Sequence, residues 1–217
     1  MAYDILPRLP DPNTSPEGPG FVSQTLLNNS PGMIHPLNSG ASVSVKFSGD
    51  YWTITLSYPK LTIAEGATLF PFLNALQGAF SNFYVQLPTS IHPRSGAWAE
   101  MPSASAVSLG DQSNQLKVSN WSGTILAAQS DLSPGDFIKL SNRHKVYMVL
   151  SVEIVDLNVA VITLSSDILD TAAVASATIE VNDIMFRVRQ EGNTPAQTLT
   201  ADGLYEAITL KLRENIL

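Results

Sequence analysis

A strict alternation of apolar and polar residues marks positions 51–58, the most regular hydrophobic pattern in the chain. Its apolar members are Trp52, Ile54, Leu56 and Tyr58. A period of two is typical of a strand that buries one face. Residues 43–47 alternate as well, and Gly49-Asp50 between the two segments has turn chemistry. We therefore predict an antiparallel hairpin formed by residues 43–47 and 51–58.

An amphipathic helix is predicted to follow this strand. Thr62 and Glu65 have the Thr-x-x-Glu spacing of a capping box, in which each side chain satisfies a backbone donor of the first turn. An apolar stripe continues at helical spacing and consists of Leu69, Leu73, Leu76 and Phe80. Pro71 predicts a kink or a restart of the helix, and Gly78 predicts its C-terminal cap. A strand over 83–87 completes a β-β-α-β unit.

Several short strands are predicted in the second half of the chain, at 115–118, 137–140, 146–154, 159–164, 177–181 and 185–189. The turn chemistry of Ser133-Pro134-Gly135-Asp136 precedes the strand at 137–140, which we expect to form a hairpin with the next one. The segments 177–181 and 185–189 are expected to form a further pair. Strands at this spacing favour a small barrel or sandwich.

A last strand is predicted near the C-terminus, where Ile208, Leu210 and Leu212 alternate with polar residues. Because an isolated strand must find a partner, we expect it to return to the first sheet beside 51–58. The predicted fold class is mainly β (α+β). It comprises an antiparallel β-sandwich or barrel with one amphipathic helix, a second small β-barrel or sandwich domain, and an extended N-terminal arm.

These elements predict a division of the chain into four parts. Residues 1–40 would be a Pro-rich extended arm, and residues 41–90 plus 204–217 a sheet-and-helix domain. Residues 116–189 would be an inserted small β domain, and 91–115 and 190–203 connecting loops. The arm contains seven prolines and no period, so it is expected to be extended. Its apolar residues Leu6, Leu9, Phe21 and Leu26 are candidate assembly contacts that dock the arm on a neighbouring subunit.

The charge content is unusually low. Only 14% of the residues are Asp, Glu, Lys or Arg, and 44% are hydrophobic, whereas soluble domains average about 25% charged residues. Two interpretations stay open: a surface rich in Ser, Thr and Asn, or a surface that neighbouring subunits cover, since interface cores are depleted in charge.

The same totals limit the partners and the compartment. A net charge of −7 with scattered basic residues argues against a nucleic-acid partner. The sequence has no apolar run long enough for a membrane span, and its N-terminus lacks the features of a signal peptide. There is no cysteine, so disulfides are excluded. We expect a protein that is made in a cytoplasm and does not insert into a membrane.

No motif for catalysis, phosphate binding or metal binding is present. His35, His92 and His144 lie in predicted loops without ligand spacing. We therefore expect no catalytic residue, no cofactor and no metal.

Two alternatives remain open beside a structural role. Loops 88–115 and 190–203, with Trp98 and Trp121 as stacking residues, would suit a carbohydrate- or receptor-binding β module. The carboxylate pairs Asp131 with Asp136 and Glu180 with Asp183 are the candidates for a glycan hydrolase. Such pairs also arise commonly in turns, where Asp caps the backbone.

The chain resembles structural proteins of tailed bacteriophages, of the distal-tail or baseplate type. Three segments carry the resemblance: Gly49-Asp50-Tyr51-Trp52-Thr53-Ile54 with the Leu-rich helix and Phe83-Tyr84-Val85 after it, Leu132-Ser133-Pro134-Gly135-Asp136-Phe137-Ile138, and Phe186-Arg187-Val188 with the last strand. The resemblance implies a homo-oligomeric ring, with a hexamer expected, that joins the tail tube to hub or fibre proteins. It implies a virion protein that is assembled in the host cytoplasm and acts through assembly.

Overall fold

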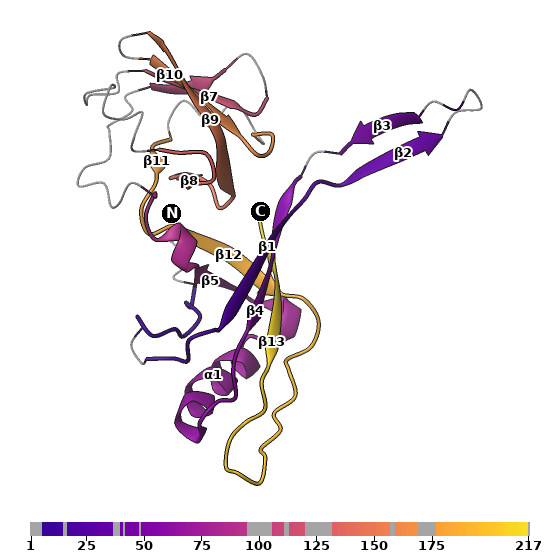
Figure 1. The fold of residues 1–217 in the computed structure, drawn as a ribbon, viewed down its shortest axis with the longest axis vertical. Helices are drawn as coiled ribbons and strands as arrows, with labels where there is room; N and C mark the ends of the chain where they lie inside the picture. Colours follow the sequence, from indigo (N-terminus) through magenta and orange to yellow (C-terminus); the bar gives the residue numbers. More distant parts are fainter. Residues whose placement is uncertain are drawn as a thin grey trace. The chain divides into compact units, whose positions relative to one another are not determined.

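The fold is described by a computed structural model that covers residues 6–14, 17–36, 40, 42–47, 49–94, 106–110, 113–119, 132–156, 159–168 and 177–216. The protein is mainly antiparallel β with one α-helix, which confirms the predicted fold class (Figure 1). The chain divides into two compact units. The first comprises Met1–Asn28, Tyr51–Val85 and Phe186–Asn215, and the second comprises Asn29–Asp50, Gln86–Met185 and Ile216–Leu217.

The first unit is built on a five-stranded sheet in the order β1-β4-β13-β12-β5. Its strands are β1 (Ser23–Asn29), β4 (Tyr51–Ser57), β13 (Thr209–Glu214), β12 (Met185–Gln190) and β5 (Asn82–Gln86). The prediction that the last strand returns beside residues 51–58 is confirmed, because Leu210 and Leu212 lie opposite Leu56 and Ile54. The apolar residues of β4 and β13 are almost fully inaccessible to solvent.

Helix α1 (Ile63–Ala75) packs on the buried face of this sheet. Its capping box is formed as predicted: Thr62 accepts from the Glu65 amide, and the Glu65 carboxylate accepts from the Thr62 amide at 2.8 Å. Phe72 meets Phe83 of β5 edge to face, with ring centroids 5.6 Å apart. The helix ends at Ala75, so the predicted cap at Gly78 is wrong; Gly78 instead begins a short 3₁₀ turn, Gly78–Phe80.

The segment between β12 and β13 folds back onto the helix. Tyr205 pairs with Leu61 through two backbone hydrogen bonds, and its ring packs edge to face on Phe70. A Cβ atom at Gly66 would lie 2.4 Å from the Tyr205 ring. Glycine is therefore required at this position by the close approach of the ring.

The second unit contains a six-stranded sheet in the order β11-β8-β9-β10-β7-β6. Its strands are β6 (Ala106–Leu109), β7 (Gln115–Ser119), β8 (Phe137–Leu140), β9 (Val146–Asp156), β10 (Val159–Leu164) and β11 (Ile179–Glu180). A 3₁₀ turn, Pro88–Ser90, precedes them. The predicted hairpin of 137–140 with the following strand is confirmed by the β8–β9 register. The expected pairing of 177–181 with 185–189 is wrong, since β11 pairs with β8 while β12 belongs to the five-stranded sheet.

A separate two-stranded sheet consists of β2 (Gly32–Pro36) and β3 (Ser42–Lys46). The predicted hairpin of 43–47 with 51–58 is therefore wrong, although both strands exist. β3 pairs with β2, which lies within the expected arm, and β4 pairs with β1 and β13. Alternation identifies a strand and its buried face, but it does not identify the partner strand. Among the described residues, no helix is long and apolar enough to cross a bilayer.

Truncation of Leu212 tests the position of the last strand. Leu212→Ala removes a fully buried side chain opposite Ile54, and such truncations cost about 2–5 kcal/mol of unfolding free energy. Lys211→Ala, on the exposed face of the same strand, is the matched control and should change it by no more than about 0.5 kcal/mol. Urea unfolding followed by circular dichroism measures both, and equal effects would contradict this placement of β13.

Candidate assembly surfaces

The N-terminal segment is attached to the edge of the five-stranded sheet. The Leu9 amide donates to the Tyr84 carbonyl at 2.8 Å, and the Tyr84 amide donates to the Pro7 carbonyl at 2.9 Å. Leu9 is only 2% exposed. Asp11 fixes the next turn by accepting from the Asn13 amide at 2.7 Å and pairing with Arg8 at 2.7 Å. Residues 7–9 thus cover the outer edge of β5.

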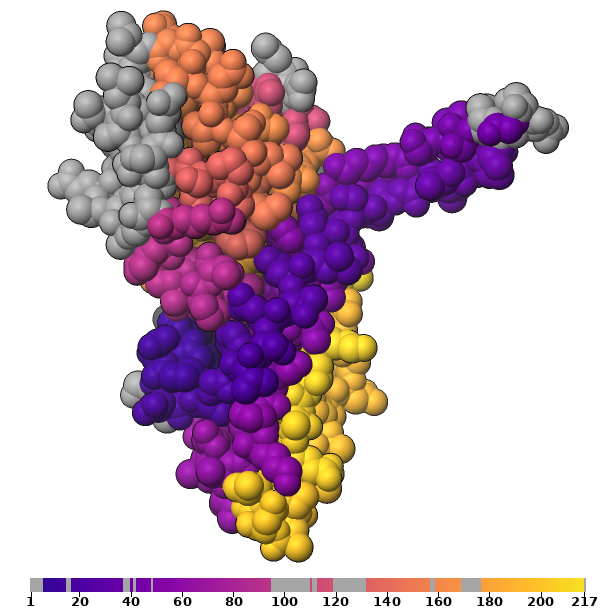
Figure 2. Space-filling view, in the orientation of Figure 1, coloured from indigo at the N-terminus to yellow at the C-terminus, as the bar shows by residue number. Residues whose placement is uncertain are grey.

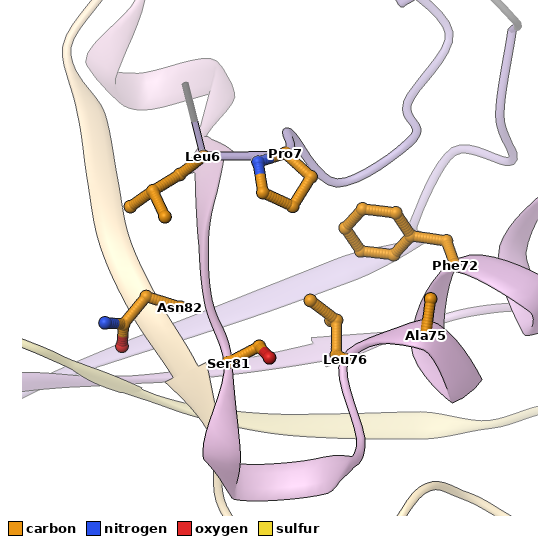
Figure 3. Close-up of a pocket in the computed structure, with 7 residues that line it drawn as sticks. All are labelled: Leu6, Pro7, Phe72, Ala75, Leu76, Ser81 and Asn82. Carbon is orange, nitrogen blue, oxygen red and sulfur yellow. The ribbon is translucent and has the colours of Figure 1, made fainter. Parts of the chain in front are cut away.

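A small apolar cavity lies where this segment meets the end of α1. It has a volume of about 370 Å³ and is lined by Leu6, Pro7, Phe72, Ala75, Leu76, Ser81 and Asn82 (Figure 3). Leu6 and Pro7 come from the N-terminal segment, while the helix end and the start of β5 supply the other residues. Apart from Ser81 and Asn82 the lining is apolar, and it presents no titratable side chain.

The four candidate assembly residues all lie in the first unit. Leu9 is buried, Leu6 lines the cavity, and Phe21 packs edge to face on Tyr58 with centroids 6.3 Å apart. Burial, with a contribution from the charge of Asp11, raises the pKa of Tyr58. Leu26 is half-buried in β1. Each of these residues therefore has a position within its own subunit.

The β2–β3 hairpin exposes a row of apolar residues on one face, and it exposes Ile34, 70% accessible, on the other. All residues of both strands are exposed, and Figure 2 draws the hairpin in purple with its side chains open on the face in view. Residues directly opposite in an antiparallel pair share a face. The register places on one face the pairs Met33 with Val45 and His35 with Val43, extended by Pro31 with Phe47. Met33, Val43, Val45 and Phe47 are each close to half exposed.

The base of the hairpin is fixed by ionic contacts within the second unit. The Lys46 ammonium lies 2.8 Å from the buried Asp50 carboxylate and 3.3 Å from Asp167. The Ser113 hydroxyl donates to Asp167 at 2.6 Å, and the buried Lys145 ammonium donates to the Asp50 carbonyl. The Asp50 contact is the main cause that raises the pKa of Lys46. The hairpin therefore has a defined root and an uncovered apolar face.

Basic residues gather on the open face of the five-stranded sheet. Arg189 of β12 lies opposite Arg213 of β13, and Arg187 and Lys211 share their face by strand alternation. The Arg213 guanidinium stacks over the Tyr51 ring at 3.8 Å, a favourable cation–π contact. The basic residues are scattered along the sequence, and this group was not predicted. Arg187 and Arg189 are two residues apart in a strand, as are Lys211 and Arg213. Residues at this spacing share one face of a strand, so the sequence did contain a pattern that indicates a basic face.

The carboxylates proposed for a hydrolase have separate structural contacts. Asp136 is buried and accepts hydrogen bonds from the Ser133 amide at 2.7 Å and the Arg94 amide at 3.1 Å, so it stabilises its own turn. Glu180 pairs with Lys139 at 3.0 Å, and Asp183 accepts from Gln86 at 3.1 Å. Asp131, Trp98 and Trp121 lie outside the described residues.

All three histidines were predicted to lie in loops, and the prediction is wrong for one of them. His35 belongs to β2 and not to a loop, whereas His92 and His144 lie between regular elements. Within the ranges that the structure describes, no three His, Cys, Asp or Glu side chains are grouped so that they could hold a metal ion.

Comparisons with known proteins agree on one family. The family model described as distal tail protein pb9, A domain, N-terminal, matches residues 9–89. These residues include Leu9 of the docked N-terminal segment, β1, the β2–β3 hairpin, β4, α1 and β5. The distal tail protein pb9 of Escherichia phage T5 is 32% identical over 214 residues, which cover 96% of this chain and 100% of that protein.

The contact of Asp167 with the hairpin root can be tested by titration. The pKa of Asp167 lies below its ordinary 3.8. The hydrogen bond from the Ser113 hydroxyl lowers it most, and the Lys46 ammonium lowers it less. Because the folded-state pKa is depressed, the contact stabilises the fold above the unfolded-state pKa and is lost as the pH falls through the folded-state value. NMR titration of the carboxyl carbon should give a midpoint below 3.8. Ser113→Ala should raise that midpoint more than Lys46→Met, and a midpoint that neither variant changes would contradict the contact.

Proposed function

The chain belongs to the distal tail protein pb9 family, and on this premise we propose that it forms a ring, as a hexamer, at the end of a bacteriophage tail tube. It is a structural component of a phage tail and interacts with other tail proteins of the virion. The proposed ring joins the tube to hub or fibre proteins. The observation that carries the proposal is the 32% identity, because it extends over the full length of the relative and 96% of this chain.

The surface of the described residues supports self-association. A closed ring needs a heterologous contact, which occupies two different surfaces on every subunit. The chain has few charged residues, 14%, and an exposed apolar hairpin face. Exposed apolar patches favour aggregation of a monomer, so these two features are better explained by a surface that other subunits cover.

The division of labour within the ring is part of the proposal. We assign the ring contacts to the domain of residues 41–90 plus 204–217, together with the arm of residues 1–40. Leu6, Leu9, Phe21 and Leu26 would act by holding the N-terminal segment and β1 in place, since these residues pack within the first unit.

The mechanism is geometric and not catalytic in this proposal. The described carboxylates that were candidates for glycan cleavage each hold a structural contact of their own. Copies of the protein would form a rigid ring around a pore. This ring would be assembled in the host cytoplasm and would remain in the virion.

Oligomeric state is the direct test of this proposal. Light scattering of the purified chain should give six times the 23.3 kDa monomer mass, and negative-stain electron microscopy should show rings with a central opening. Asp136→Asn, which changes a hydrolase candidate, should leave ring formation unaffected if the variant folds. A chain that remains a monomer over the whole concentration range, and binds glycans in that state, would refute the ring.

A further inference from the structure

We propose that the basic residues on the open face of the five-stranded sheet bind an acidic surface of another tail protein. This basic face consists of Arg187 and Arg189 of β12 and Lys211 and Arg213 of β13. The inference rests on the proposed function, because family membership implies contacts with other tail proteins but does not identify the surface that makes them.

The register of the sheet brings the positive charges together. Arg189 lies directly opposite Arg213, and Lys211 shares their face because it precedes Arg213 by two residues in the same strand. Like charges directly opposite each other destabilise an antiparallel pair. The arrangement therefore costs stability in the free subunit, and a partner that places carboxylates beside the two arginines would remove the repulsion.

The sheet itself does not neutralise these charges. Its five strands, all of them described, contain one acidic residue, Glu214. That side chain is buried, and its carboxylate accepts a hydrogen bond from the Trp52 amide at 3.1 Å. Glu191 follows β12 directly and its amide donates to the Lys211 carbonyl at 2.7 Å, so one carboxylate borders the face. The face keeps an excess of positive charge.

The basic face also differs from other basic residues in its ion pairs. Five basic residues elsewhere in the chain each pair with a carboxylate: Arg8, Lys46, Lys60, Arg94 and Lys139. Within the part of the chain that the structure describes, no carboxylate pairs with Arg189, Lys211 or Arg213. These three charges are therefore available to a partner.

Arg213 is held in position for such a contact. Its guanidinium stacks over the Tyr51 ring at 3.8 Å, which limits the side-chain freedom that binding would remove. A guanidinium presents a planar set of donors that matches a carboxylate through two parallel hydrogen bonds. On the neighbouring strand β4, Thr53 lies opposite Arg213, so a hydroxyl group joins the same face. The face thus has both the charge and the donors to bind carboxylates.

Another protein fits this face better than a second copy of the chain does. Several solvent-accessible carboxylates of the chain have partners of their own: Asp167 with Lys46, Asp202 with Lys60 and Glu180 with Lys139. A second copy would have to break these pairs before the same carboxylates could bind the arginines. A tail protein with unpaired carboxylates on its surface would bind without that cost.

Nucleic acid fits the face less well than an acidic protein. The chain carries a net charge of −7, and a duplex that extends beyond two strands of a sheet would meet the acidic remainder of the chain. A protein surface can place its carboxylates on the basic face alone, since complementary charges on two proteins are arranged patch against patch.

Binding of fluorescein-labelled poly-L-glutamate, measured by fluorescence anisotropy, tests the face. The wild-type chain should bind this probe at low salt and release it as sodium chloride is added, because salt screens exposed charges. Arg189→Gln combined with Arg213→Gln should weaken binding about tenfold or more, since each arginine supplies charge-assisted hydrogen bonds.

The matched control removes the same charge elsewhere. Lys60→Gln combined with Arg94→Gln changes two exposed basic residues outside the face and should leave the affinity for poly-L-glutamate close to the wild-type value. The thermal unfolding midpoint of each variant shows whether it folds.

Selection of compensating changes in a phage identifies the occupant. In a phage whose copy of this protein carries Arg189→Glu, the yield of infectious particles should fall about tenfold or more, because like charges across an interface are strongly unfavourable. Second-site changes that restore infectivity should replace an acidic residue by a basic one in another tail protein.

The possible outcomes separate this inference from the proposed function. A wild-type chain that stays a monomer, but binds poly-L-glutamate through the two arginines, refutes the ring and supports the basic face. A wild-type chain that does not bind the probe, equal weakening in the two double variants, or tighter binding of duplex DNA of equal charge overturns the inference while the ring stands. Loss of rings in the folded arginine variant, or compensating changes within this chain, would mean that a second copy occupies the face, which also overturns the inference.

Discussion

The first unit depends on the pairing of β4 with β13, which are far apart in the sequence. Leu56 and Ile54 of β4 lie opposite Leu210 and Leu212 of β13, and these side chains are completely buried. The pairing places the last strand in the middle of the sheet, between β4 and β12. Helix α1 and the segment around Tyr205 then cover the buried face. In the sequence, β4 is the strand that follows the exposed hairpin of β2 and β3.

The surfaces left open by this arrangement differ in chemistry. The hairpin face is apolar and uncharged, whereas the open face of the sheet carries Arg187, Arg189, Lys211 and Arg213. Within an acidic chain, a basic face is complementary to acidic partners. An apolar contact and a separate basic face are features of a subunit that binds more than one neighbour. This agrees with a phage tail component that interacts with other tail proteins.

Local patterns predicted the individual elements well. The alternation at 51–58, the capping box of Thr62 and Glu65, and the hairpin after Asp136 each follow from short-range chemistry, and the structure has all of them. The return of the last strand beside residues 51–58 was also predicted, since an isolated strand needs a partner, and β13 does pair with β4. β1 and β2 were not predicted, because the expected arm in which they lie is rich in proline and shows no alternation of apolar and polar residues. The partner of β3 and the basic face depend on long-range pairing, which no local pattern specifies.

Amide hydrogen exchange of the hairpin tests most directly whether a second copy covers it. The outward-facing amides of β2 and β3 have no partner strand within the two-stranded sheet, so they should exchange quickly in dilute, monomeric protein. At concentrations where oligomers form, the same amides should become protected, because their opening would then require subunit dissociation. Equal exchange rates at both concentrations, in a sample that light scattering shows to be oligomeric, would contradict the account.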